Sequence, residues 1–308
     1  MAGMRTAEFD AFGPWVMQVV AEEGVPRLYR DHPIDFDAVR MVLKVPRNIL
    51  RRDASPEMHL YDHLLVADHA GLTVLSRHDD AYTTLVVPYA RVAAVHTSVV
   101  LLDGLFRLYD VDGTAANGVA IDLPFNGVSL DVVEQLARVV RREALATAPA
   151  RSLGQPGGAP LRPELDDLGR TDVALISSAR ELTAKEELVV WAMHHRLGVQ
   201  RRAGMLGGLT SVIFPPTVHA ALVGATSGEV HLVHRRPWVT TGRKPVHSVA
   251  HTVITASRVD RVEVSDHPGF TDTQLVRVVS GRAVVELPVP AGAPTIDALL
   301  TLLGARVS

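Results

Sequence analysis

A stretch near the middle of the chain divides its 308 residues into two parts of similar length. Residues 144–170 contain four prolines and the pair Gly157-Gly158, and apolar residues do not recur there at helical or strand spacing. Because proline fixes φ and removes a backbone donor, and glycine loosens the backbone, no regular element is expected to persist. We therefore predict one domain over residues 1–146, an exposed linker over 147–170 and a second domain over 171–308.

The two parts carry the same landmarks in the same order. Arg91–Val95 and Arg258–Val262 share the pattern Arg-Val-x-x-Val, and each follows a strand-like run. Further along, Ile121–Phe125 and Val285–Val289 each place an acidic residue, a leucine and a proline before an apolar residue. The last apolar-periodic segment of each part comes next. This agreement predicts an internal duplication.

Each part places its strands first and a helix last. Runs rich in Val, Leu and aromatic residues, separated by Asp-Gly turns, predict strands over 60–67, 72–77, 83–89, 93–102, 105–109 and 119–125. Apolar residues at helical spacing predict helices over 129–142 and 295–303, with Ser129 and Thr295 as N-caps. Residues 35–52 and 180–197 are interpreted as a helix ahead of each set of strands. The fold class is therefore mostly β with α (α+β).

This plan resembles the bacterial type of pleckstrin-homology-like (PH-like) domain. The resemblance is carried by residues 72–124 with the helix at 129–142, and again by 230–288 with the helix at 295–303. It implies two tandem bent antiparallel sheets or barrels, each closed by a C-terminal amphipathic helix. Lipid-binding members of this family use basic residues around the loop after the first strand. Here the loops at 67–71 and 224–228 contain no Lys or Arg, so phosphoinositide-type headgroup recognition is not expected.

A basic segment around a tryptophan is the favoured binding surface. It lies between two strands of the second part, where we expect an exposed loop that combines charge with an amphipathic ring. The alternative is an ordinary surface loop with a half-buried ring. Its residues are Arg235, Arg236, Trp238, Arg243 and Lys244.

A second basic patch lies in the first part. Its residues recur at steps of about four and three, which would place them along one side of a helix that Pro46 interrupts. Such a stretch can lie on an anionic membrane surface or bind an acidic partner. The alternative is a solvated helix face whose apolar side packs on the sheet. The patch consists of Arg40, Lys44, Arg47, Arg51 and Arg52.

Histidines are the remaining candidates for chemistry. The chain has 14 histidines and no cysteine, so disulfides and thiolate metal sites are excluded. His231 with His234, His247 with His251, and the adjacent pair at 194–195 could in principle share a metal, with Glu229 nearby. We favour hydrogen-bonded or exposed imidazoles instead. No phosphate loop or nucleophile elbow is present, and no cofactor or metal is expected.

Charge and composition limit the function classes. A formal net charge of −3 argues against a globally basic nucleic-acid binder. The uncharged stretch 203–226 is long enough to cross a bilayer, but Pro215-Pro216 interrupts it and its end matches a strand of the second repeat. We predict a non-enzymatic, cytoplasmic binding or scaffolding protein with another protein as partner. The alternatives are a peripheral protein at the inner membrane face that uses the basic clusters, and a metal-dependent enzyme with a histidine-lined site.

Overall fold

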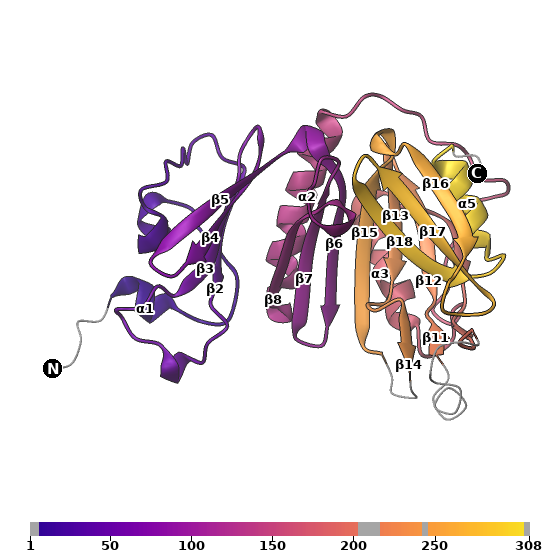
Figure 1. The fold of residues 1–308 in the computed structure, drawn as a ribbon, viewed down its shortest axis with the longest axis horizontal. Coiled ribbons are helices and arrows are strands. Elements are labelled where there is room, and N and C mark those ends of the chain that lie inside the picture. The colour runs from indigo at the N-terminus through magenta and orange to yellow at the C-terminus, as the bar shows by residue number, and fades with distance from the viewer. Residues whose placement is uncertain (1–5, 203–215, 242–245, 305–308) are drawn as a thin grey trace. The chain divides into compact units, whose positions relative to one another are not determined.

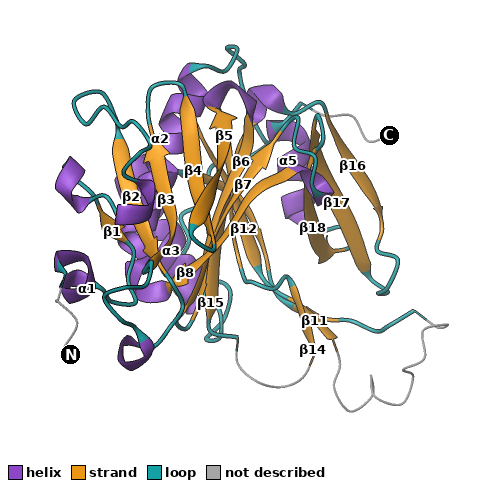
Figure 2. Ribbon diagram, turned by 60° about the vertical axis from the view of Figure 1, so that its left-hand side comes forward, coloured by secondary structure: helices purple, strands orange, loops and turns teal. Residues whose placement is uncertain are grey.

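The structure is a computed structural model that describes residues 6–202, 216–241 and 246–304. Two compact units are present: residues 1–92, 102–106 and 123–147 form the first, and residues 93–101, 107–122 and 148–308 form the second. Antiparallel sheets and a few helices make up both, which confirms the α+β class (Figure 2). None of the sheets formed by the described residues closes into a barrel, so the barrel alternative is wrong.

The first unit is built on an antiparallel sheet in the order β1-β2-β3-β4-β5 (Figure 1). Apolar side chains of β2, β3 and β4 pack with Tyr29 and Phe12 into one core. The helical elements before and between the first strands are short: α1 (Ala7–Ala11) and the 3₁₀ helices η1 (Glu22–Gly24), η2 (Arg27–Tyr29) and η3 (Arg51–Asp53). The strands are β1 (Met17–Gln18), β2 (Met41–Pro46), β3 (Tyr61–Ala67), β4 (Gly71–His78) and β5 (Ala81–Pro88), and η4 (Tyr89–Arg91) follows.

Helix α2 (Leu130–Ala146) belongs to the first unit. Its buried residues Val133, Leu136, Ala137, Val140 and Ala144 recur every three or four positions, as the sequence predicts. Ser129 occupies the N-cap position, as predicted, but its side chain makes no capping hydrogen bond. Its Oγ instead accepts the backbone N–H of Val16 at 2.8 Å.

The second unit contains five strands in the order β6-β15-β13-β12-β9. They belong to a seven-stranded sheet in which β7 and β8 follow beyond β6. Its strands are β6 (Val92–Val100), β7 (Asp103–Asp110), β8 (Val119–Asn126), β9 (Val189–His194), β12 (Ala221–Thr226), β13 (Glu229–His234) and β15 (Ser248–Thr255). A small sheet joins β10 (Leu197–Gly198), β11 (Pro216–Val218) and β14 (Val239–Thr241). Short 3₁₀ turns are η5 (Ala116–Gly118) and η6 (Gly127–Ser129), and helix α3 spans Val173–Glu186.

A three-stranded antiparallel sheet and a helix end the second unit. The sheet order is β16 (Arg261–Asp266), β17 (Thr273–Ser280) and β18 (Ala283–Pro290), after η7 (Ala256–Arg258). Helix α5 (Pro294–Leu302) contributes Ile296, Leu299 and Leu302 to the same core as Val276 and Leu287. Thr295 does not cap this helix. Ala293 occupies the N-cap position, and Thr295 Oγ1 lies 2.8 Å from Nδ1 of His194.

Two of the predicted helices are wrong or too long. Residues 41–46 form the buried strand β2, because a run of five buried side chains suits the centre of a sheet and Pro46 opposes helix continuation. The helix predicted over 180–197 ends at Glu186. Glu187 adopts a left-handed conformation, and the chain then enters β9. The β-branched pair Val189-Val190 favours that change.

The predicted linker is irregular but is not a free tether. Arg151 donates to the carbonyls of Ala256 (2.9 Å), Val259 (3.0 Å) and Leu303. Leu153 packs on the core that α5 covers, and Leu161 donates from its backbone to Val190 of β9 at 2.8 Å. Residues 148–170 are therefore part of the second unit.

Replacing Arg151 tests this attachment. Arg151→Ala removes a guanidinium that holds three backbone carbonyls, so we expect the free energy of unfolding to fall by about 2 kcal/mol. Urea denaturation followed by circular dichroism measures the loss. Arg162→Ala, at an exposed position of the same segment, is the control and should leave the midpoint unchanged. Equal midpoints for both variants would contradict the attachment.

Candidate functional site

Arg235, the first residue of the predicted basic segment, is buried rather than exposed. It is 3% exposed, and Nε and Nη2 each lie 3.0 Å from Oδ1 of Asp172. The guanidinium also donates to the carbonyls of Thr171 and Ser248. Asp172 lies at the start of α3, so this ion pair attaches the helix to the sheet. The prediction that Arg235 lies on an exposed surface is therefore wrong, because a buried carboxylate neutralises its charge.

Trp238 and Arg236 of the same segment also contact other parts of the second unit. The ring of Trp238 stacks on His234, with centroids 3.9 Å apart and planes 10° apart, and it packs against the core of the second unit. Arg236 is half-buried and donates from Nη1 to Oγ of Ser98 at 3.1 Å. Arg243 and Lys244 lie outside the described residues. The described part of this segment thus has a structural role.

Substitution at Arg235 should therefore act on stability. Arg235→Met leaves the Asp172 carboxylate buried without its partner, which we expect to lower the free energy of unfolding by roughly 3–5 kcal/mol. Arg236→Met, which loses one bond to a hydroxyl, should cost about 1 kcal/mol. Thermal and urea unfolding of the two variants makes the comparison. A fully stable Arg235→Met protein would contradict the assigned role.

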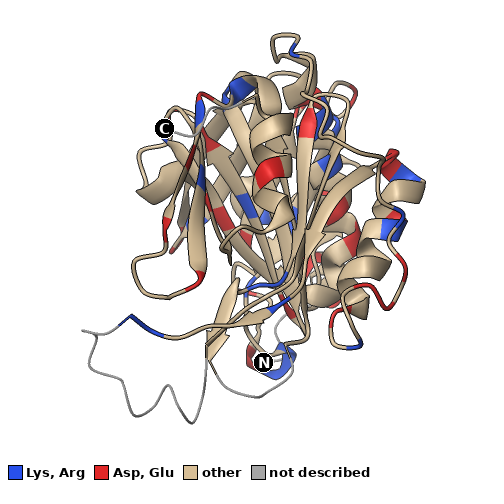
Figure 3. Cartoon of the chain, turned by 90° about the vertical axis from the view of Figure 1, so that its right-hand side faces the viewer, with Lys and Arg blue, Asp and Glu red and all other residues tan. Residues whose placement is uncertain are grey.

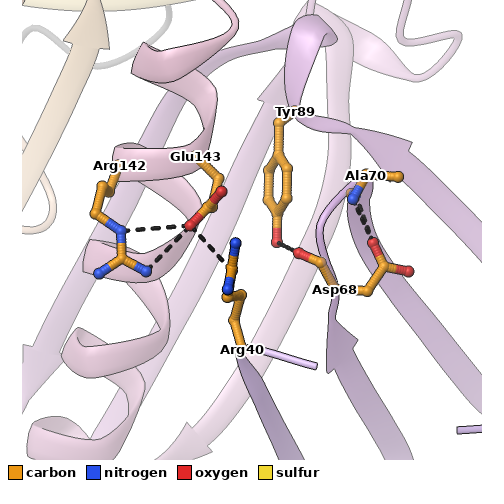
Figure 4. Close-up of polar contacts among 7 residues, drawn as sticks. Arg40, Asp68, Ala70, Tyr89, Arg142 and Glu143 are labelled. Atoms are coloured by element: carbon orange, nitrogen blue, oxygen red, sulfur yellow. Dashed lines mark hydrogen bonds and ion pairs between the residues drawn. The ribbon is translucent and has the colours of Figure 1, made fainter. Parts of the chain in front are cut away.

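The second basic patch does not lie along a helix. Arg40 precedes β2, and its Nε lies 3.3 Å from Glu143 Oε1, to which Arg142 also binds (Figure 4). The same view shows the Tyr89 hydroxyl donating to the carbonyl of Asp68 at 3.0 Å, which ties η4 to the β3–β4 turn. Arg52 is exposed beside Asp53.

The other three residues of this patch, Lys44, Arg47 and Arg51, donate to backbone carbonyls of the first unit. Lys44 is buried, and this burial lowers its pKa. Its Nζ donates to the carbonyl of Gly24 at 3.1 Å and lies 5.0 Å from the centroid of the Tyr61 ring. Arg47 donates to the His59 carbonyl at 3.2 Å. Arg51 donates to the Phe12 carbonyl at 2.7 Å and covers the Phe9 ring. The five residues thus do not form one cationic surface.

A cavity of about 410 Å³ borders Lys44. Glu8, Arg27 and Arg30 also line it. Arg27 donates to the carbonyl of Pro56, Arg30 donates to the carbonyl of Val25, and Glu8 accepts the backbone N–H of Arg27. These charged groups hold the irregular segments around the cavity, and opposite charges are interspersed in it.

One predicted histidine, His234, and one unpredicted histidine, His96, belong to a buried polar chain across β6, β15 and β13. His96 Nδ1 lies 2.8 Å from Thr252 Oγ1, which lies 2.9 Å from His234 Nε2. His96 Nε2 lies 3.0 Å from Ser98 Oγ, and His234 Nδ1 lies 2.9 Å from the carbonyl of Arg235. His231 of the same strand β13 contacts His251 at 3.0 Å.

The partners assign the protons in this chain. A carbonyl only accepts, so His234 donates from Nδ1 to Arg235, and its neutral ring accepts the Thr252 hydroxyl proton at Nε2. Thr252 then accepts from Nδ1 of His96, and His96 accepts the Ser98 hydroxyl proton at Nε2. Ser98 completes the series by accepting from Arg236. Every donor is matched to an acceptor when both imidazoles are neutral.

Burial keeps these rings neutral. It lowers the pKa of His234 from 6.5 to about 4 and places the pKa of His96 well below its usual value, with the neighbouring His234 adding to the latter shift. Burial also lowers the pKa of His194 to about 4. The unfolded chain binds these protons at a higher pH than the folded chain does. The contribution of the neutral rings to the free energy of unfolding is therefore fully present above pH 6.5 and is lost as the pH falls through about 4.

The pH dependence of unfolding tests the histidine chain. Between pH 6.5 and 4 the free energy of unfolding should decrease, with His234 contributing on the order of 3 kcal/mol. In His234→Gln this slope should be smaller, whereas His195→Gln, at an exposed position, should keep the parent slope. Urea titrations at a series of pH values give the slopes. Identical slopes in all three proteins would contradict a neutral buried His234.

The rings of His231 and His194 have structural partners, whereas His247 is exposed. His231 is fully buried, with its Nε2 3.0 Å from Thr226 Oγ1 and 3.7 Å from Glu229. His194 bonds Thr295 and the carbonyl of His219. His247, before β15, accepts the backbone N–H of Leu101 at its carbonyl. Among the residues that the structure describes, no three His, Asp or Glu side chains converge as a metal site.

The described surface feature most suited to binding is one that the sequence analysis did not identify. Strand β5 forms one edge of the five-stranded sheet, and in the described part of the chain it pairs only with β4 (Figure 1). Leu85 and Val86 point to opposite faces and are 42% and 54% exposed. No residue of Ala81–Pro88 is charged. A long, uncharged, apolar edge is an expected site of strand pairing.

The sequence feature that could have indicated this edge strand is the absence of charged residues from positions 81–88. Many natural edge strands carry lysine or inward-facing charge that opposes pairing. The residues were predicted as a strand, but nothing local indicates which strand lies at an edge. Figure 3 shows Lys and Arg interspersed with Asp and Glu over the chain.

No family model and no curated protein matches the chain. In the described residues, no helix has the length and apolar character needed to span a membrane. Residues 203–215 of the uncharged stretch lie outside the described residues, and Thr217–Val218 and 221–226 belong to β11 and β12.

Proposed function

We propose that this chain is a non-enzymatic binding or scaffolding protein made of two PH-like repeats, and that it binds another protein through the edge of β5. The repeats would comprise β2 to α2 and β9 to α5. The edge would act by adding a strand, in which backbone hydrogen bonds supply affinity and side chains at alternate positions supply specificity.

The order of elements supports the duplication. In each half, a first series of antiparallel strands ends along the chain in an eight-residue strand, β5 or β15, which a three-residue 3₁₀ helix follows. In both turns the following valine donates to the first residue of the helix, from Val92 to Tyr89 and from Val259 to Ala256. Three strands and a helix come next in each half, and β7, β8, β17 and β18 have eight residues each.

The partners of the reactive side chains favour binding over catalysis. His96, His234 and His194 are buried, and both nitrogens of each ring are already within hydrogen-bonding distance of a partner. A general base needs access to a substrate proton. These imidazoles instead satisfy buried hydroxyl and carbonyl groups.

The state of the basic residues disfavours the membrane alternative. Arg235 is neutralised by Asp172, and Arg40 faces Glu143. A membrane surface is attracted by cations that remain in solvent. Lys44 and Arg51 instead serve backbone carbonyls of the first unit.

The exposed edge of β5 is the observation that carries the proposal. Its side chains Leu85 and Val86 are about half exposed, although the adjacent strand β4 is buried from Gly71 to Leu75. Apolar side chains on both faces and an unpaired backbone would be covered together by an added strand.

A lysine on the edge tests the proposal. Val86→Lys adds a charge that opposes strand pairing, so intact Val86→Lys protein should retain bound proteins from its native cells at least about tenfold less than the parent. Val20→Lys makes the same change at a 78% exposed valine outside β5 and is the matched control. Quantitative affinity capture compares the three. The same proteins retained by all would overturn the proposal, and salt-sensitive binding to anionic vesicles would support the membrane alternative.

A further inference from the structure

The strand edges of the described residues differ in whether they can accept another strand. Among the edge strands longer than three residues, β8 and β18 contain Pro124 and Pro288 in their interiors, where proline removes a ladder donor. Strand β5 has its proline, Pro88, only at its last position. The edge of β9 is occupied by the bridge from Leu161 to Val190. Strand β5 and strand β16, which pairs only with β17 among described residues, are the two that remain.

Within the chain, two strands that correspond to β5 and β16 are already paired with each other. Strand β15 pairs antiparallel with β6 in a ladder that runs from Ser248↔Val100 to Ile254↔Ala94. In the repeat alignment, β15 corresponds to β5, since each directly precedes the 3₁₀ helix of its half. Strand β6 corresponds to β16, since each follows that helix. The two remaining edges are therefore the counterparts of two edges that already bind each other.

We propose that β5 of one copy of this chain pairs antiparallel with β16 of a second copy, in the register of the β15–β6 ladder. This inference rests on the proposed function and names its partner as the chain itself. The two edges differ, so the contact is heterologous: each copy offers β5 to one neighbour and β16 to another.

The internal ladder fixes the expected partners. Arg91 aligns with Arg258, an offset of 167 positions by subtraction of the residue numbers. The pair Thr252↔His96 then becomes Leu85↔Glu263, and Val253↔Val95 becomes Val86↔Val262. Because β5 has no charged residue, Arg261 and Glu263 of β16 meet no like charge across the proposed ladder. The exposed Val86 would face a valine, as Val253 does within the chain.

Disulfide trapping tests the contact directly, because the chain has no cysteine of its own. Full-length Leu85→Cys and Glu263→Cys proteins are mixed and oxidised, so that a mixed disulfide can form only between two copies. We expect the mixed dimer to form at least about tenfold faster than with Ser265→Cys in place of Glu263→Cys, which is two residues out of register. Disulfides mainly between two Leu85→Cys chains would instead indicate β5–β5 pairing and overturn the proposal.

A charge exchange tests the same register without cross-linking. Leu85→Glu places a carboxylate opposite Glu263, and sedimentation should show self-association weakened about tenfold or more. Leu85→Lys places the opposite charge beside the same carboxylate and should weaken self-association less. Adding Glu263→Lys to Leu85→Glu should restore association. Equal effects of Glu and Lys, or no rescue, would overturn the proposed register.

The two proposals fail in different ways. A parent chain that sediments as a monomer at all accessible concentrations, while Val86→Lys still loses captured proteins, overturns the second-copy partner and leaves the β5 binding edge standing. If Val86→Lys still self-associates and still retains the captured proteins, both proposals are overturned. A Leu85→Cys/Glu263→Cys double variant that cross-links only within one chain also rejects the second copy.

Discussion

The ladder between β6 and β15 is the interaction on which the rest of the second unit depends. It joins residues that lie between 148 positions (Val100 with Ser248) and 160 positions (Ala94 with Ile254) apart in the chain. Pairing at such separation costs chain entropy that local hydrogen bonds do not recover, so burial along the strands must offset it. Ala94 and Val95, with Val253 and Ile254 opposite them, are buried and supply that apolar area. Without this ladder, two further strand edges would be unpaired.

The same ladder explains why the histidines are buried. Thr252 lies opposite His96, and His234 reaches Thr252 from the next strand, so a polar series crosses three strands. Buried polar groups are tolerable when each donor meets an acceptor, and neutral imidazoles meet this requirement here. Arg235 and Asp172 follow the same principle with charges. Residue types that suggest chemistry or binding in the sequence thus support the fold, and the proposed binding rests instead on exposed backbone at the edge strand β5.

Local pattern predicted the elements well. The six strands predicted between residues 60 and 125 correspond to β3–β8, and both terminal helices are present as α2 and α5. Side-chain periodicity and turn residues act over a few positions, so they can be recognised in one sequence. The segment between residues 40 and 52 was misassigned because a short, mostly apolar run such as Met41–Val45 is compatible with a buried strand as well as with a helix. The burial of Met41–Val45 distinguishes the two, and it depends on β3 and on the short strand β1.

The spacing of apolar residues, prolines and glycines along the chain was sufficient to define an α+β protein, an irregular middle segment and two similar series of elements. The partners of those elements came only from contacts across the fold. Ser129 and Thr295 have the chemistry of helix caps, yet they bond Val16 and His194, which lie 113 and 101 positions away. Arg235 resembles a solvent-facing cation until Asp172, 63 positions earlier, is placed beside it. A side chain's intrinsic chemistry is local, whereas its burial and its partner depend on residues that sequence spacing does not bring together.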